Sequence, residues 1–438
     1  KINVMKKYIG ITIISIILFG CGSSGNGELT GVQKRSVWNP TTPYGMVYVP
    51  QGSYVMGPSD QDVPFANVTS AKTVSVGAFY LDETEITNNE YRQFTNWVRD
   101  SIAHIVLGEA GIEGHLIEED EFGNFLEPAR INWKTKIRWN DPEIREILEE
   151  EMYLSDHERF DGKREFDTRK FIYKYQVIDL QEASIKENRE GDAVGKRDRS
   201  QFLSEIEINI YPDTLVWTHD YAYSLNDPYS KNYFHHPAFD DYPVVGVNWK
   251  QANAFADWRT KVMTDFLKKS GDPVIAEFRL PTESEWEYAA RGGLDFSPYP
   301  WGGPYTRNVK GCFLANFKPL RGNYTADGGL KTIKVGSYNP NGYGLYDMSG
   351  NVAEWTSNAF DESAFSFAHD LNKDYHYDAK EDDHQVLKRK VIRGGSWKDI
   401  SYFIQTSTRS YEYQDTAKSY IGFRCAVDFL GRDQKDFE

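Results

Sequence analysis

The chain has 438 residues, a formal net charge of −15 and an aromatic content of 15%. That aromatic content excludes an intrinsically disordered chain and indicates a large packed core. The negative charge argues against nucleic-acid binding, because such affinity comes mainly from neutralising phosphates. Three cysteines are too few for a disulfide framework, and the spacing leaves open whether Cys312 and Cys425 form a bond.

The first residues are typical of an export signal. Two lysines precede a nearly unbroken apolar run, Tyr8 to Phe19, which is shorter than the roughly 20 residues that a spanning helix needs. The following LFGC sequence, Leu18 to Cys21, resembles a bacterial lipobox. We expect residues 1–20 to be a signal peptide, Cys21 to carry the lipid, and 21–43 to be a flexible tether. An ordinary signal peptide with an unrelated cysteine is the alternative.

The globular part is predicted to begin at residue 44 with short strands and a helix. Met46 to Met56 alternates apolar and small residues around a Pro-Gln-Gly turn, which predicts two strands, and Val74 to Glu85 predicts further strand. Thr87 and Glu90 form a capping-box pair before an amphipathic helix. The residues expected on its buried face are Tyr91, Phe94, Val98 and Ile102.

Between residues 107 and 243 the sequence becomes densely charged. One helix is predicted here, with Asp141 as its cap and Pro142 at its first position. Strands are expected at Phe171–Leu180 and Ile206–Trp217. More than a hundred residues with many aromatics rarely persist as structureless loop, so we expect an interaction surface, with a tolerated loop elaboration as the alternative.

The second half starts with two further helices. Asn248 is expected to cap a long one, whose buried side chains would be Ala252, Phe255, Trp258 or the stem of Arg259, and Val262. Thr282 and Glu285 form another capping box, and Gly292-Gly293 would end that helix. Beyond Tyr299 the chain is rich in Gly, Pro, Trp and Tyr with few periodic runs, which predicts irregular loops.

Four blocks of this chain resemble the formylglycine-generating enzyme family. They are FRLPTESEWEYAARGG from Phe278, NGYGLYDMSGNVAEWTS from Asn341, RGGSW from Arg393 and GFRCAVD from Gly422. The resemblance implies an α+β fold related to C-type lectins, loop-rich and low in regular secondary structure. It also divides the chain, with family-like parts at 44–106 and 244–431, a large mixed α/β insertion at 107–243, and a tail at 432–438.

The resemblance bears directly on activity. Enzymes of this family oxidise a substrate cysteine with copper(I), using two cysteines that follow the GGS-aromatic turn. Asp399 and Ile404 stand near those places here, and no cysteine lies between Cys312 and Cys425. Because copper(I) demands soft thiolate ligands, we expect the fold without its oxidation chemistry: no copper and no enzyme.

The resemblance further implies two structural calcium sites. Calcium takes six to eight oxygen ligands, so a few side chains together with carbonyls and waters suffice. The first site would use Asn316, the carbonyl of Phe317, Asp327 and the carbonyl of Gly329; the second would use Asn351, the carbonyl of Val352 and Glu354. The alternative is that these residues are only caps and turn residues.

Together, the lipobox, the opening MVYVPQGSYVMGPSDQD from Met46, the insertion and the missing thiols are similar to the gliding-motility lipoproteins GldK and PorK of the type IX secretion system. This implies a lipid-anchored protein on the periplasmic face of the outer membrane, which assembles with GldN or PorN and with itself into a ring. Such a ring needs head-to-tail contacts whose rotation closes. The alternatives are the paralogous lipoprotein GldJ, a peptidoglycan- or carbohydrate-binding lipoprotein, and an enzyme of unrecognised chemistry.

Overall fold

The computed structural model describes residues 41–58, 71–120, 122–159, 162–189, 199–220, 227–320, 323, 325, 326 and 329–431. The predicted lipidation residue Cys21 and the predicted ligand Asp327 lie outside them. The chain from Thr41 onward forms one compact unit, so residues 107–243 do not separate as a unit of their own. No helix in the described part is both long and apolar enough to cross a membrane.

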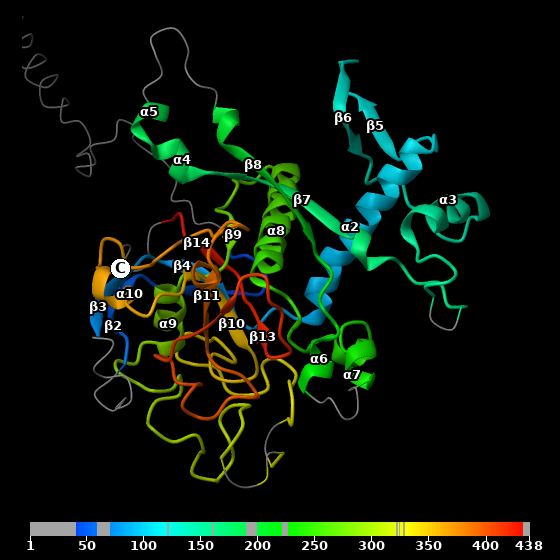
Figure 1. Cartoon of the computed structure of the whole chain (residues 1–438). Helices are drawn as coiled ribbons and strands as arrows, with labels where there is room; N and C mark the ends of the chain where they lie inside the picture. Colours follow the sequence, from blue (N-terminus) through cyan, green and yellow to red (C-terminus); the bar gives the residue numbers. More distant parts are fainter. Residues whose placement is uncertain are drawn as a thin grey trace, which may run out of the picture. The chain divides into compact units, whose positions relative to one another are not determined.

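The described chain begins with four strands, ends with four strands and carries its α-helices between them (Figure 1). The α-helices are α2 (Asn88–Glu109), α3 (Pro142–Met152), α4 (Leu180–Ser184), α5 (Lys186–Arg189), α6 (Val216–Asp220), α7 (Asp227–Asn232), α8 (Trp249–Ser270), α9 (Glu283–Arg291) and α10 (Ala364–Phe367). The 3₁₀ helices are η2 (Thr168–Lys170), η3 (Arg199–Phe202), η5 (Pro237–Phe239) and η6 (Gln385–Lys388). The strands are β1 (Met46–Val49), β2 (Gly52–Met56), β3 (Lys72–Val76), β4 (Phe79–Asp82), β5 (Leu116–Glu119), β6 (Phe125–Ile131), β7 (Ile172–Ile178), β8 (Leu203–Asn209), β9 (Phe278–Arg279), β10 (Ala353–Ala359), β11 (Arg389–Arg393), β12 (Ser410–Tyr413), β13 (Ile421–Gly422) and β14 (Ala426–Asp428).

Within the described residues these strands form two four-stranded sheets and three two-stranded ribbons. One sheet has the order β1-β4-β14-β9 and the other β12-β11-β10-β13, while β2–β3, β5–β6 and β7–β8 pair in isolation. The strand near the C-terminus, β14, lies between β4 and β9, so the two ends of the domain share one sheet. The two strands predicted in Met46–Met56 are present, but they do not pair together: β1 pairs with β4 and β2 with β3.

The local signals for helices are confirmed. Thr87 caps α2, Asn248 caps α8 and Thr282 caps α9, each in a reciprocal capping box. Asp141 caps α3, with Pro142 at its first position as predicted. Val262 was expected in the core, yet 42% of it is exposed, because the last turns of α8 extend past the core and bury only Leu267.

An aromatic core ties residues 107–243 to the rest of the domain. Tyr91 of α2 stacks on Phe255 of α8 with ring centroids 5.6 Å apart, and Phe94 meets Tyr173 of β7 at 5.2 Å. Tyr173 also donates a hydrogen bond to Asp257 of α8 at 2.7 Å. The ribbon β7–β8 is therefore anchored through the buried face of its first half.

One strand of this region was placed wrongly from the sequence. The strand expected at Ile206–Trp217 is β8, which ends at Asn209, and Trp217 belongs to α6. Pro212 follows the strand and cannot donate to a ladder, and Asp213 then accepts from the amide of Leu215 to start a turn. Trp217 is buried against Tyr233, and that tertiary contact fixes its position.

Candidate functional site around the GGS turn

Helix α9 forms the floor of the site. All nine of its residues are buried, although three are glutamates and one is an arginine. Buried charges must be paired, so the partners of these side chains decide what the helix holds in place. Glu285 pairs with Arg279, and Glu283 accepts from Arg409 at 2.5 and 3.0 Å.

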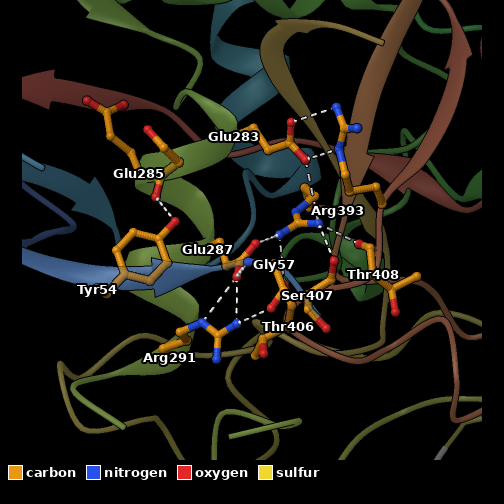
Figure 2. Close-up of polar contacts among 12 residues, drawn as sticks. Tyr54, Gly57, Glu283, Glu285, Glu287, Arg291, Arg393, Thr406, Ser407 and Thr408 are labelled. Atoms are coloured by element: carbon orange, nitrogen blue, oxygen red, sulfur yellow. Dashed lines mark hydrogen bonds and ion pairs between the residues drawn. The ribbon is translucent and has the colours of Figure 1, made fainter. Parts of the chain in front are cut away.

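Glu287 and Arg393 make the central pair (Figure 2). Arg393 ends β11, is fully buried, and also donates to the carbonyls of Thr406, Ser407 and Thr408 at 2.8–2.9 Å. Arg291 donates to the same Glu287 carboxylate at 2.6 Å. Burial alone would raise the pKa of Glu287, but the guanidinium groups of Arg393 and Arg291 hold it below its ordinary value. The segment after the GGS turn is thus clamped to α9 at its far end.

The near end of that segment is fixed by Asp399. Its Oδ2 accepts from the backbone amide of Ser396 at 2.9 Å and from its hydroxyl at 2.6 Å. Its carbonyl accepts from the amide of Lys318 at 2.8 Å. Burial raises the pKa of the Asp399 carboxyl against these hydrogen bonds. Gly395 has φ +64, and a Cβ there would lie 2.6 Å from the carbonyl oxygen of Phe403, so this turn requires glycine.

Ile404, at the second expected thiol position, is a core residue. It is fully buried in a cluster with Tyr299, Phe313, Ala315 and Phe317, and its carbonyl accepts from Ser349 Oγ at 2.7 Å. One thiol position is therefore used for a turn and the other fills apolar space. Neither side chain is a thiol, so neither position offers the soft ligand that copper(I) needs.

The two described cysteines lie elsewhere. Both Cys312 and Cys425 are free, so they do not form the bond that the sequence left open. Burial raises the pKa of the Cys425 thiol, as does the nearby carboxylate of Asp82. Within the described ranges, no three His, Cys, Asp or Glu side chains are grouped so as to hold a metal ion.

The first predicted calcium set is brought together in part. Asn316 is buried and uses its amide hydrogens on the Lys331 carbonyl, at 2.9 Å, and on Asn351 Oδ1, at 3.3 Å, which leaves its own Oδ1 as an acceptor. Phe317 and Gly329 line one cavity of about 250 Å³. Asp327 is not among the described residues. Besides Phe317 and Gly329, two lysines, Lys318 and Lys398, line that cavity, so structural calcium bound through Asn316 stays a prediction.

In the second predicted set, the side chains already have protein partners. Both carboxylate oxygens of Glu354 accept from Arg424, at 2.6 and 2.7 Å, and one also accepts from Trp286 at 2.7 Å. The side-chain NH2 group of Asn351 donates to the Glu85 carboxylate, and its Oδ1 accepts from the backbone amide of Ile333. Calcium at this site would therefore compete with a guanidinium for Glu354.

Sequence reasoning missed Glu85, Asp347 and Arg424. These residues and Glu354 form a buried group in which three carboxylates face one guanidinium. Burial, followed by the charges of Asp347 and Glu354, raises the pKa of Glu85, and burial raises that of Asp347 to about 6. Glu85 lies two residues before the Thr87 cap, and Asp347 lies two residues before the Ser349-Gly350-Asn351 turn. The local pattern around each residue explains it as part of a cap or turn, so the sequence gives no sign of a shared site.

The cavity next to Asp399 is lined by both charged and apolar side chains. Lys398 pairs there with Asp220, and Trp397 forms part of the wall. Trp397 is buried and stacks on Trp217 at 6.2 Å. The pair of charges can orient a polar group.

Comparison with known proteins identifies the family of this chain. The family model described as the sulfatase-modifying factor enzyme 1-like domain matches residues 33–429. The bovine (Bos taurus) formylglycine-generating enzyme is 26% identical over 401 residues, covering 89% of this chain and 76% of the relative. A bovine protein described as inactive C-alpha-formylglycine-generating enzyme 2 is 34% identical over 192 residues, covering 42% of this chain and 50% of the relative.

Further relatives are bacterial. The formylglycine-generating enzyme of Streptomyces coelicolor is 35% identical over 192 residues, with coverage of 43% of this chain and 53% of that protein. The chain thus spans about half the length of this relative and of the inactive bovine one. Among solved structures, PvdO from Pseudomonas aeruginosa aligns with a TM-score of 0.45 and 18% identity, over 91% of this chain and all of that one. From the match over 33–429, the chain belongs to the sulfatase-modifying factor enzyme 1-like domain family, with the mixed α+β fold of formylglycine-generating enzyme homologues.

Proposed function

We propose that this family member is a non-catalytic lipoprotein of the GldK and PorK type. In this proposal Cys21 anchors it to the periplasmic face of the outer membrane, and it assembles with GldN or PorN, and with itself, into a structural ring of the type IX secretion and gliding machinery. The paralogue GldJ is the alternative within this class. One of the relatives is itself described as inactive, which supports a non-catalytic role for this chain.

The proposal that the protein is non-catalytic rests on the residues that occupy the two expected thiol positions. Asp399 closes a turn through Ser396, and Ile404 fills the core beside Phe313. Clamping by Arg393 makes this segment rigid, which suits a scaffold. Copper(I) would need thiolates at these two places.

Charge distribution supports an assembly role for the insertion. Residues 107–243 contain 31 acidic and 17 basic side chains, so they hold nearly all of the net charge of −15. A region with a net negative charge favours association with a partner of opposite charge and disfavours neighbours of the same sign. We therefore propose that this region contacts GldN or PorN through a basic surface of that partner.

The assembly proposal is tested on the native lipoprotein. Extraction from the membrane in mild detergent, mass photometry and identification of co-purifying chains should give a large complex that contains the partner. Cys21→Ser should shift the protein out of the membrane fraction. Recovery of a lone monomer from intact membranes would remove the ring proposal, whereas membrane attachment of Cys21→Ser would remove only the lipid anchor.

Activity and wall binding are tested separately. The copper(I)-treated protein should yield no aldehyde on a cysteine-containing peptide, with a formylglycine-generating enzyme as the positive control; stoichiometric copper and aldehyde would make this an enzyme. Co-sedimentation with purified sacculi would favour the peptidoglycan-binding alternative, which could coexist with assembly.

A further inference from the structure

The ribbon β7–β8 presents unpaired strand edges. Its seven residue pairs run without a bulge from Ile172–Asn209 to Ile178–Leu203, and no further described strand joins it. Figure 1 shows it as a two-stranded arm passing over α8. A two-stranded ribbon is marginal on its own, and an open edge is a template for another strand.

Apolar side chains are exposed along β7. Tyr173 is buried on the helices, but Ile172, Val177 and Ile178 are 41%, 40% and 54% exposed. Edge strands are often protected by an outward lysine. Here Lys174 forms an ion pair with Glu207 on β8, so its charge is balanced within the ribbon.

The sequence of β7 is complementary to itself. It reads Ile-Tyr-Lys-Tyr-Gln-Val-Ile, centred on Tyr175. In an antiparallel pair of two copies about that centre, Ile172 lies opposite Ile178 of the second copy, Tyr173 opposite Val177, and Lys174 opposite Gln176. Apolar residues meet apolar ones and no like charges meet, and each opposed pair shares a face of the sheet.

The edge of β8 lacks this property. An antiparallel pair of two β8 strands centred on Ile206 would place Glu205 opposite Glu207 of the second copy, twice. Like charges directly opposite each other are destabilising. The complementarity of β7 therefore selects one of the two edges.

We propose that two copies of this chain pair through the outer edges of β7, forming a continuous four-stranded sheet in the order β8-β7-β7-β8. The contact is two-fold and isologous, so it closes at the dimer. It would add backbone hydrogen bonds and cover the exposed isoleucines and Val177. The dimer goes beyond the ring proposal and does not require the lipid or a second protein.

Substitutions of Gln176 should change the stability of the dimer and the stability of the ribbon in opposite directions, so they distinguish the two. Within one chain Gln176 faces Glu205, whereas across the proposed dimer it faces Lys174. Gln176→Glu should therefore weaken the ribbon but tighten the dimer, and Gln176→Lys should do the reverse. With two such pairs per dimer, the expected change in the dimer dissociation constant is roughly two- to thirtyfold in each direction.

The measurement is sedimentation equilibrium of the detergent-solubilised full chain, with each variant's folding checked by urea denaturation. A dimer that tightens with Gln176→Glu and weakens with Gln176→Lys supports the proposal. A chain that stays monomeric, or a dimer that responds to neither variant, overturns it, since an interface elsewhere would be indifferent to residue 176.

Register is tested by a disulfide between different variants. In a Cys312→Ser background, mixing the Lys174→Cys and Gln176→Cys chains should give a disulfide-linked heterodimer, identified by mass spectrometry of the joined peptides, because opposed residues lie within bonding reach. A Lys174→Cys and Ile178→Cys mixture is the matched control, since these positions are not opposed. Equal yields in the two mixtures would contradict the register centred on Tyr175.

Discussion

Arg393 connects a buried carboxylate to the backbone of the segment after the GGS turn. It pairs with Glu287 and donates to three consecutive carbonyls that end at Thr408. We expect Arg393→Met to cost about 3–5 kcal/mol of unfolding free energy, because it removes the guanidinium and leaves buried acceptors unpaired. Urea denaturation followed by tryptophan fluorescence measures this.

An exposed ion pair is the control for that experiment. Lys334 and Asp241 pair at 2.6 Å, but their side chains are 62% and 59% exposed. Lys334→Met should change the unfolding free energy by less than about 1 kcal/mol. Similar losses in the two variants would mean that burial of the Arg393 network is unimportant for stability.

Two buried histidines at the start of the insertion, one just before it and one within it, should make stability depend on pH. His104 of α2 and His115 before β5 lie with their Nδ1 atoms 2.9 Å apart, near Asp100 and Arg138. Burial, together with the neighbouring His115, lowers the pKa of His104, and burial with the charge of Arg138 lowers that of His115. The unfolded chain then binds more protons once the pH falls below about 6.5.

Stability that is present above that pH should therefore be lost as the pH falls from 7 to 5. Each proton contributes a slope of at most about 1.4 kcal/mol per pH unit. His104→Gln removes one titrating group, so its unfolding free energy should fall less steeply over this range. Urea titrations at pH 7, 6 and 5 compare the slopes, and identical slopes in the variant and the parent chain would refute the role of the pair.

The capping box of α9 tests how far a single helix end supports the site. Thr282 Oγ1 accepts from the amide of Glu285, and Glu285 accepts from the amide of Thr282. Thr282→Ala should cost about 1 kcal/mol, within a range of roughly 0.5–2, while Thr282→Ser should retain most of the stability. Thermal unfolding of the two variants shows whether the hydroxyl or the methyl group matters.

Elements were predictable where their signals are local. The capping boxes at Thr87 and Thr282 gave the starts of α2 and α9, since each involves residues three apart. The pairing of β1 with β4 and the exposure of Val262 depend on contacts distant in sequence, which no short pattern encodes. The absence of cysteines at the two expected thiol positions could be read from the residues that follow the GGS turn. The pairing of Arg393 with Glu287 could not, because the two residues lie far apart in the sequence.

At the scale of the whole molecule, the long loops between α9 and β10 need the most stabilisation from outside regular secondary structure. Among the described residues from Gly292 to Val352 there is no named helix or strand, only an isolated bridge between Arg307 and Phe313. Backbone groups in such loops need partners other than ladders. A cation bound by Asn316 and nearby carbonyls would satisfy several of them and join distant turns.

We therefore expect calcium to stabilise the fold. With free calcium at one hundred times its dissociation constant, the gain is about 2.7 kcal/mol per site, and EGTA should remove it. Asn316→Ala should abolish most of the calcium-dependent rise in melting temperature.

Asn308→Ala is the matched control. The Asn308 side chain only closes an exposed turn, accepting from the amides of Lys310 and Cys312, so the calcium response of this variant should persist. An unchanged response in Asn316→Ala would place any stabilising calcium elsewhere, and its absence in the parent chain would exclude a stabilising role for calcium in these loops.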